Sequence, residues 1–351
     1  MGAVGYSSPS SSQWLFPVGA LNATPSTETS GISLEKELYD RARGVEFLFR
    51  LGTSLALPGS AMFTAATWFH RFYMRYSMED YHRQDVAASC IFLVTKTEEC
   101  GRKLRDVAKV YHMKVAGVEA SQVPPDSPEV ELCQVMILQT EEALLEALCF
   151  DFVVDNPHAE LADLFDAHPD EFKVQEYAWS FASDSYRTPL CILYPPRVIA
   201  AACYILAQRV AEGPQSASLD ARLSSPAPVS SLPTPPSHKA TSPNASRFAI
   251  EHFAFNEVEL AGVADALAIL LEFYNAQDVT GSADYLQPVV AVVPPSAQQR
   301  RPLYRPFSQS SSSSGPQDAG LQGRTPNSSH GGNTPSKTLS QGWEPVGEPK
   351  D

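Results

Sequence analysis

Residues 91–107, IFLVTKTEECGRKLRDV, pass from an apolar run into a cluster of charged residues. The segment that leads into the cluster, residues 83–100, is apolar nearly all round, and its small residues at 87–89 allow neighbouring helices to approach closely. A helix of this kind belongs at the centre of a bundle. Lys96 lies on the side of that helix that carries the apolar residues one turn earlier, so its aliphatic stem continues a buried stripe.

Four segments around this central helix carry helical periodicity and complete a five-helix unit. Leu38 and Ala42 begin a series of apolar steps of three and four residues, which predicts one buried helix face. Gly101 marks the end of the central helix, and Ser127 followed by Pro128 is typical of a capped helix start. The four segments are residues 34–55, 58–76, 103–114 and 129–152.

Two ionisable residues of this unit fall on apolar helix faces. Lys96 does so on the central helix, and Glu141 does so on the last helix, beside Leu138 and Leu145. An isolated buried charge is costly, so we expect Lys96 and Glu141 to pair if their helices are adjacent. Spacing alone leaves two interpretations open: an ion pair that ties two helices together, or a charged anchor on an apolar surface that binds a partner's helix.

The same plan restarts about 100 residues later. The segment YPPRVIAAACYILAQRV at 194–210 repeats the small residues and the apolar run of the first central helix. Helical segments precede and follow it. The sequence therefore predicts an all-α fold of two tandem, related bundles.

Three segments are rich in Ser, Pro, Gly and other polar residues, and such compositions cannot bury enough apolar surface to fold. We therefore expect disordered tails and a disordered insertion in the second bundle. The expected organisation is a disordered tail at 1–33, a first bundle at 34–153, a second bundle at 154–280 with a disordered insertion at 212–246, and a disordered tail at 281–351.

Composition and motif spacing exclude several classes of function. The formal net charge of −14 argues against a broad nucleic-acid footprint, and no run of apolar residues reaches the roughly 20 that a membrane span needs. Six cysteines without a C-x-x-C pair and eight histidines without metal-ligand spacing predict reduced core thiols and no metal site. A catalytic pair with Cys90 as the nucleophile and His70 as its base is a possible interpretation, but Cys90 lies within AASCIFLV, which favours a packing role for the thiol. His70 with Arg71 is likewise expected to serve helix packing and a local ion pair.

TKTEECGRKLRDV resembles the cyclin-box signature, in which a lysine, one further residue and two acids close the third helix. RGVEFLFRLGTSLALP, TAATWFHRFYM, DVAASCIFLVTKTEE and LLEALCFDF look like the first, second, third and fifth helices of a cyclin box, in order. The resemblance covers residues 35–280. Within the family it is strongest to transcriptional cyclins of the C, K, T and L kind and to the β subunit of the fungal kinase that phosphorylates the RNA polymerase II C-terminal domain.

The resemblance implies a regulatory subunit that binds and activates a cyclin-dependent kinase acting on the polymerase tail, in the nucleus, without a cofactor or catalytic residues of its own. It implies that Lys96, which precedes the T-E-E sequence, and Glu141, nine residues before Phe150 of the F-D motif, contact the kinase. The further candidates for kinase contacts are Glu98, Glu99 and the adjacent Glu142. For Glu98 and Glu99, an equal alternative is charge attraction to the next helix.

Two rival functions remain at this stage: a general transcription factor that binds promoter DNA through cyclin-like repeats, and a scaffold whose partner is not a kinase. The net charge and the absence of zinc-ligand spacing argue against the first. The basic stretch RRPLYRPF at 300–307 is expected to be a solvated tail, with binding to an acidic partner as the alternative. The Ser-Pro and Thr-Pro pairs that a proline-directed kinase would recognise begin at Ser225, Thr234, Ser242, Thr325 and Thr334.

Overall fold

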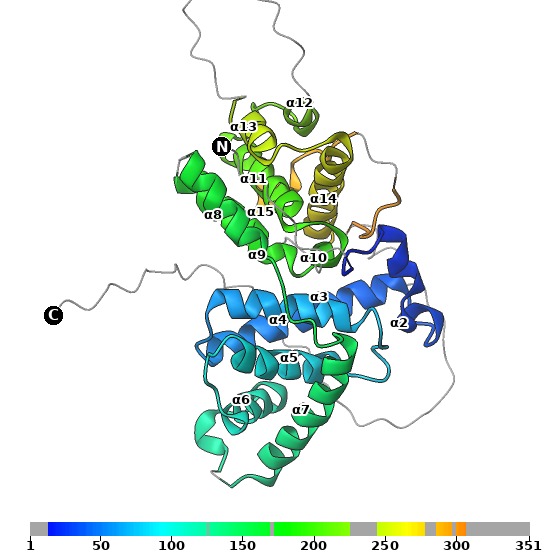
Figure 1. Ribbon diagram of the computed structural model, residues 1–351, viewed down its shortest axis with the longest axis vertical. Helices are drawn as coiled ribbons and strands as arrows, with labels where there is room; N and C mark the ends of the chain where they lie inside the picture. Colours follow the sequence, from blue (N-terminus) through cyan, green and yellow to red (C-terminus); the bar gives the residue numbers. More distant parts are fainter. Residues whose placement is uncertain are drawn as a thin grey trace, which may run out of the picture.

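The computed structural model describes residues 13–124, 126–168, 172–224, 244–277, 286–296 and 300–306, and every regular element in these ranges is a helix. The helices form two groups that pack on each other, with α3 (Leu34–Ser54) and α4 (Gly59–Phe72) at the junction (Figure 1). The prediction of an all-α fold is therefore confirmed.

The first group surrounds α5 (Arg83–Thr97), whose residues 86–95 are all buried. α5 packs against α3, α4 and α7 (Pro128–Ala147), and α6 (Leu104–Ala116) packs on α7. The central position predicted for this helix is confirmed, because neighbours cover it on all sides. The short elements before and within this group are η1 (Val18–Ala23), α2 (Pro25–Glu28) and η2 (Ala120–Gln122).

The helix ends follow the local sequence. The Ser127 hydroxyl accepts a hydrogen bond from the backbone N–H of Val130, and Pro128 occupies the first turn of α7, as predicted. α5 ends at Thr97, earlier than Gly101, and the chain then turns through left-handed conformations at Glu99 (φ 52°) and Gly101 (φ 58°). The charged cluster therefore covers the last turn of α5, with Lys96, and the turn that follows it, with Glu99.

Two glycines set the spacing between α3 and α4. A Cβ atom at Gly44 would lie 2.2 Å from Cζ of Phe69, and one at Gly52 would lie 2.6 Å from Sδ of Met62. Both distances are far below van der Waals contact. A Cβ atom at Gly44 or Gly52 would therefore force the Phe69 ring or the Met62 side chain to move, or α3 and α4 to separate.

The second group surrounds α11 (Pro196–Glu212), which packs against the helices before and after it in the sequence. Its residues 198–208 are all buried, so the predicted echo of the first central helix is found at the centre of the second core. The other helices of this group are α8 (Pro157–Ala167), α9 (Phe172–Ser185), α10 (Leu190–Leu193), α12 (Leu219–Leu223), α13 (Asn244–Phe253), α14 (Glu257–Asn275) and α15 (Leu286–Val290).

Aromatic rings and two histidines fill the junction between the groups. Phe63 of α4 stacks on His158 of α8, with ring centroids 3.9 Å apart, and on Tyr186, at 5.1 Å. His70 Nε2 lies 2.8 Å from the carbonyl oxygen of Tyr186. Burial, together with the charge of Arg41, lowers the pKa of His70 to about 3, and burial lowers the pKa of His158 to about 4. Both imidazoles are therefore neutral at pH 7.

The prediction of a disordered tail at 1–33 is wrong for residues 13–33. The indole N–H of Trp14 donates to the Asp151 carboxylate at 3.0 Å, and only 5% of Trp14 is exposed. The hydroxyl of Thr24 donates to the buried carboxylate of Glu37 at 2.5 Å. The order around Trp14 could not be predicted from local sequence, because Asp151 lies 137 residues further along the chain.

The prediction of a disordered insertion at 212–246 is wrong for residues 212–224 and 244–246, which the structure describes as ordered. α12 forms inside it, with Leu219 buried, and the buried guanidinium of Arg222 bonds the Ser246 hydroxyl at 2.9 Å and pairs with Glu212. Residues 225–243 lie outside the described residues. The buried arginine ties the two ends of the insertion together.

The prediction of a disordered tail at 281–351 is wrong for residues 286–296 and 300–306. α15 buries Val289, Val292 is buried just after it, and Ser296 donates from its N–H and its hydroxyl to Asp220. The Thr-Pro pairs at Thr325 and Thr334 lie outside the described residues.

Candidate functional site

The ion pair predicted between the two helices of the first group is confirmed. Lys96 Nζ lies 2.6 Å from Oε1 of Glu141, and it also lies 4.4 Å from the ring centroid of Phe92. A second contact joins the same two helices: the Ser89 hydroxyl of α5 donates to the carbonyl oxygen of Ile137 in α7 at 3.0 Å. The pair therefore bridges two packed helices.

The two partners differ in exposure. The Glu141 side chain is 7% exposed, whereas the Lys96 side chain is 48% exposed. The carboxylate is thus held inside the protein while half of the lysine remains open to a further contact. The neighbouring residue Glu142 is exposed and points elsewhere on α7, so Glu141 is the residue that meets Lys96.

Three further predicted residues, Glu98, Glu99 and Glu142, lie at the end of α5 and on α7. Glu98 is the C-cap residue of α5 and is half-buried, Glu99 is exposed, and Glu142 is exposed on α7. The N-cap residue of α6 is Lys103, whose side chain makes no capping hydrogen bond, and charge attraction from Glu98 and Glu99 to α6 stays a prediction. The structure therefore brings all five predicted residues to the α5 and α7 side of the first group.

α7 also presents an exposed apolar surface that sequence reasoning missed. Leu132, Val135 and Leu138 are 70%, 52% and 47% exposed, and we call these three residues the α7 face. Helical spacing continues this stripe through Glu142 to Glu146. This surface could not be predicted from the sequence, because α7 carries apolar residues on both its buried side and its exposed side.

The chain after α7 is conformationally unusual. Cys149 and Phe150 adopt left-handed backbone conformations, with φ values of 51° and 57°, and Phe150 is 66% exposed. Non-glycine residues rarely adopt this conformation, and such residues concentrate at binding sites. A large exposed aromatic ring thus lies on a constrained turn just after the C-terminal end of α7.

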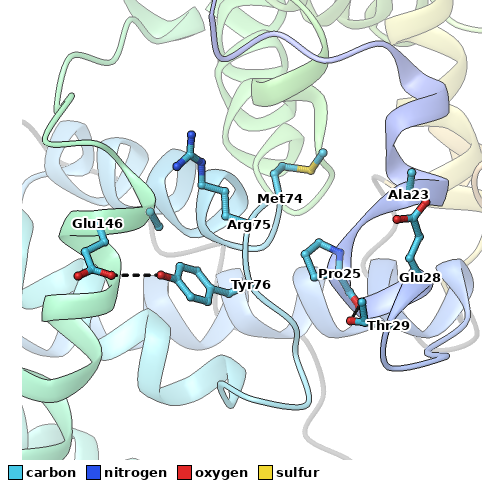
Figure 2. Close-up of a pocket in the computed structure, with 9 residues that line it drawn as sticks. Ala23, Pro25, Glu28, Thr29, Met74, Arg75, Tyr76 and Glu146 are labelled. Atoms are coloured by element: carbon cyan, nitrogen blue, oxygen red, sulfur yellow. Dashed lines mark hydrogen bonds between the residues drawn. The ribbon is translucent and has the colours of Figure 1, made fainter.

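A surface pocket of about 520 Å³ lies at the end of the same stripe. The N-terminal segment forms one wall of it through Pro25 and Glu28, and α7 forms another through Glu146. Figure 2 shows the Glu146 carboxylate directed at the hydroxyl of Tyr76, 3.4 Å away, while the Arg75 guanidinium points away from both. Partial burial and the negative charge of Glu146 raise the pKa of Tyr76.

The structure gives no support to the nucleophile and base weighed for Cys90 and His70. Burial raises the pKa of the Cys90 thiol well above its usual value. Both ring nitrogens of His70 face other groups, the Tyr186 carbonyl and Arg41. His70 is a packing residue, as predicted, whereas Arg71 donates to the carbonyl oxygen of Val153 and stacks on an indole in place of the expected ion pair. Across the described ranges, no cluster of three or more His, Cys, Asp or Glu side chains suits a metal ion.

The first group of helices has a recognisable family pattern. Residues 22–153 match the family described as "Cyclin, N-terminal domain". These residues form a cyclin domain. The match begins within η1, so the cyclin domain includes most of the N-terminal segment that packs against α3. All five predicted site residues lie within it.

The cyclin domain and part of the second group are similar to transcriptional cyclins. Cyclin pch1 of Schizosaccharomyces pombe is 41% identical over 199 residues, which are 56% of this chain and 58% of that protein. Cyclin-K of Homo sapiens is 33% identical over 201 residues, which are 56% of this chain and 33% of that protein. The chain thus spans less than two thirds of the length of these relatives.

The fold extends the similarity beyond the cyclin domain. A chain in the crystal structure of the yeast RNA Pol II CTD kinase CTDK-1 complex matches with a TM-score of 0.53 and 18% identity, covering 90% of this chain and 85% of that one. The likeness supports the shared two-bundle architecture. Among the helices that the structure describes, none is long and apolar enough to cross a membrane.

Proposed function

We propose that this protein is the regulatory subunit of a cyclin-dependent kinase that phosphorylates the C-terminal domain of RNA polymerase II. The observation that carries the proposal is the half-exposed Lys96 over the buried Glu141, at the edge of an exposed apolar helix face. An apolar surface with a charged anchor is suited to receive an amphipathic helix of a partner.

The assigned residues have separate roles. Lys96 offers ammonium protons to a carboxylate or carbonyl of the kinase, and Glu141 keeps that ammonium in place. Glu98 and Glu99, which follow Lys96 closely in the sequence, and Glu142 on α7 add negative charge to this side of the protein, which attracts a basic partner surface. The α7 face supplies the apolar area that such an interface needs at its centre.

The similarity to cyclin pch1 and to cyclin-K supports a kinase partner, and the fold shared with a chain of the CTDK-1 complex supports the polymerase tail as substrate. The cyclin domain would act by holding a helix of the kinase inward, so that the kinase's own lysine–glutamate pair and metal-binding aspartate align for phosphoryl transfer. This chain would contribute no reacting group.

The proposal is tested by purifying the tagged full chain from its own cells and assaying the eluate on a polymerase-tail peptide. Wild type is expected to bring down a kinase and its activity. The double variant Lys96→Glu, Glu141→Lys keeps two opposite charges adjacent but reverses what the partner meets, and it is expected to lose both. A wild-type eluate without kinase activity contradicts the proposal and favours the scaffold or the promoter-binding factor.

A second variant guards against misfolding, because the double variant places a lysine at a buried position. Leu138→Asp changes a side chain that is already 47% exposed and is expected to lower kinase recovery at least tenfold while the melting temperature stays within a few degrees. Val258→Asp, at the exposed start of α14 in the second group, is the matched control and should leave recovery unchanged. Equal recovery with Leu138→Asp and Val258→Asp would remove the α7 face from the interface.

The proposal also includes nuclear localisation, since a kinase acting on RNA polymerase II works there. Fluorescence microscopy of the tagged full chain in its own cells provides the measurement. A signal excluded from the nucleus would contradict this part of the proposal.

A further inference from the structure

The basic stretch near the end of the described chain is docked on the second group of helices. The Glu272 carboxylate of α14 receives the guanidinium of Arg300 at 2.8 Å and 3.2 Å, one nitrogen to each oxygen. The backbone N–H of Leu303 donates to the same carboxylate at 2.7 Å, and that of Tyr304 lies 3.4 Å from it. The side chains of Arg300 and Glu272 are only 10% and 12% exposed, so this is a desolvated and oriented contact.

The apolar side chains of the stretch are held as well. Leu303 and Tyr304 pack against the second core, and the ring of Tyr304 meets that of Phe273 edge-on at 5.6 Å. Burial raises the pKa of Tyr304, which keeps its phenol neutral. A charged contact and a buried aromatic ring thus hold one short peptide.

The same stretch reaches the first group. Arg305 lies 3.7 Å from the Glu35 carboxylate at the start of α3, although both side chains are largely exposed. The positive charge of Arg41, also on α3, acts on Tyr304. The contact surface therefore spans α14 and α3, away from α5 and α7.

We propose that the surface formed by Glu272, Phe273 and Glu35 is a binding site for short segments of the pattern Arg-x-x-Leu-Tyr-Arg, and that residues 300–305 of this chain are its occupant. All recognition elements lie within six consecutive residues, and Pro302 fixes its own φ, which narrows the range of conformations of the unbound segment. Glu272 accepts hydrogen bonds both from a guanidinium and from two successive backbone N–H groups, which reach the same carboxylate because the chain bends at Leu303 and Tyr304. The site is independent of the proposed kinase contacts.

The proposal is tested in trans. A chain ending at residue 296 retains the Ser296 contacts with Asp220 but lacks the occupant. A fluorescent peptide of residues 298–306 is expected to bind it with a micromolar Kd by fluorescence anisotropy, and to bind the full chain at least tenfold more weakly because the site is filled. Peptides carrying Arg300→Ala or Tyr304→Ala should lose at least tenfold in affinity.

Arg301 supplies the matched control, because its exposed side chain has no ion pair among the described residues. The Arg301→Ala peptide should bind like the natural one. Equal losses for Arg300→Ala and Arg301→Ala would indicate nonspecific charge attraction and overturn the proposal, as would no binding to a shortened chain with native circular dichroism.

Hydrogen exchange of the full chain decides the matter if the shortened chain unfolds. The N–H groups of Leu303 and Tyr304 are expected to exchange at least tenfold more slowly than in the free peptide, and Glu272→Gln should remove most of that protection. Exchange at the free-peptide rate in the wild-type chain would overturn the proposal.

Discussion

At the scale of single residues, the Lys96–Glu141 pair is asymmetric. The lysine is half in water and loses little solvation, whereas the glutamate is almost fully enclosed. The net energy of such a pair depends mainly on the buried partner, because an uncompensated buried charge is the costly state. A residue at the edge of a binding surface can therefore also be a stabilising residue of the free protein.

This asymmetry predicts different costs for the two deletions. Lys96→Ala strands a buried carboxylate and is expected to lower the free energy of unfolding by about 1–3 kcal/mol. Glu141→Gln leaves a half-exposed lysine that turns to water, and its expected cost is below about 1 kcal/mol. Urea denaturation at pH 7 measures both. A larger loss for Glu141→Gln would show that the glutamate has a role in packing beyond the pair.

The two junction histidines predict an acid-dependent loss of stability. Their folded-state pKa values, about 3 for His70 and about 4 for His158, lie below the ordinary 6.5, so the unfolded chain binds more protons between these values. Stability is therefore complete above pH 6.5 and falls as the pH drops toward 4. Each histidine costs up to about 1.4 kcal/mol per pH unit in this range.

His158→Phe tests this linkage, because phenylalanine preserves the stacking on Phe63 without a titrating group. Urea denaturation at pH 7 and pH 5 is expected to show a smaller difference for the variant than for wild type, by about 2 kcal/mol at most. The same pH dependence in both proteins would contradict the assignment.

At the scale of elements, the helices of the cyclin domain were predictable and their exposed sides were not. Periodicity identified α3, α4, α5 and α7, and the expense of isolated charges predicted the Lys96–Glu141 contact. The exposure of Leu132 and Val135 could not be predicted, because a hydrophobic period does not distinguish a side buried in the core from one available to a partner. The pocket beside Glu146 could not be predicted either, because one of its walls comes from the N-terminal segment, through Pro25 and Glu28.

The contact between α3 and α4 yields a prediction at this scale. Gly44→Ala places a methyl group 2.2 Å from the Phe69 ring, so the helices must separate or the ring must move. The expected loss is about 1–3 kcal/mol from overpacking, despite the better helix propensity of alanine. Gly19→Ala in η1, where nothing lies within 4 Å, is the control and should change the unfolding midpoint little.

At the scale of the whole molecule, both ends of the described chain serve as connections between the two groups. The backbone N–H of Phe16 donates to the carbonyl oxygen of Ile192 at 2.8 Å, and Arg305 reaches Glu35. The order of these segments could not be predicted from local sequence, because it depends on partners elsewhere in the chain, such as Ile192 for Phe16 and Glu35 for Arg305.

Trp14 tests how much the N-terminal segment contributes. Trp14→Ala removes a 95% buried indole that bonds Asp151 and stacks on Arg71, so we expect a loss of about 3 kcal/mol in the free energy of unfolding. Gln13→Ala removes only an exposed amide that bonds the same carboxylate, and it should cost less than about 1 kcal/mol. Equal effects would mean that the carboxylate, and not the indole, anchors the segment.

The hydrogen bond from Phe16 to Ile192 has a consequence for synthesis on the ribosome. The two residues are 192 − 16 = 176 positions apart, so at about 5–20 residues per second the partner of Phe16 is made roughly 9–35 s later. During that interval the cyclin domain can assemble and Trp14 can bond Asp151, while the backbone N–H and the ring of Phe16 still lack their partners in the second group. A nascent chain paused before residue 192 should therefore be the form that molecular chaperones bind most strongly.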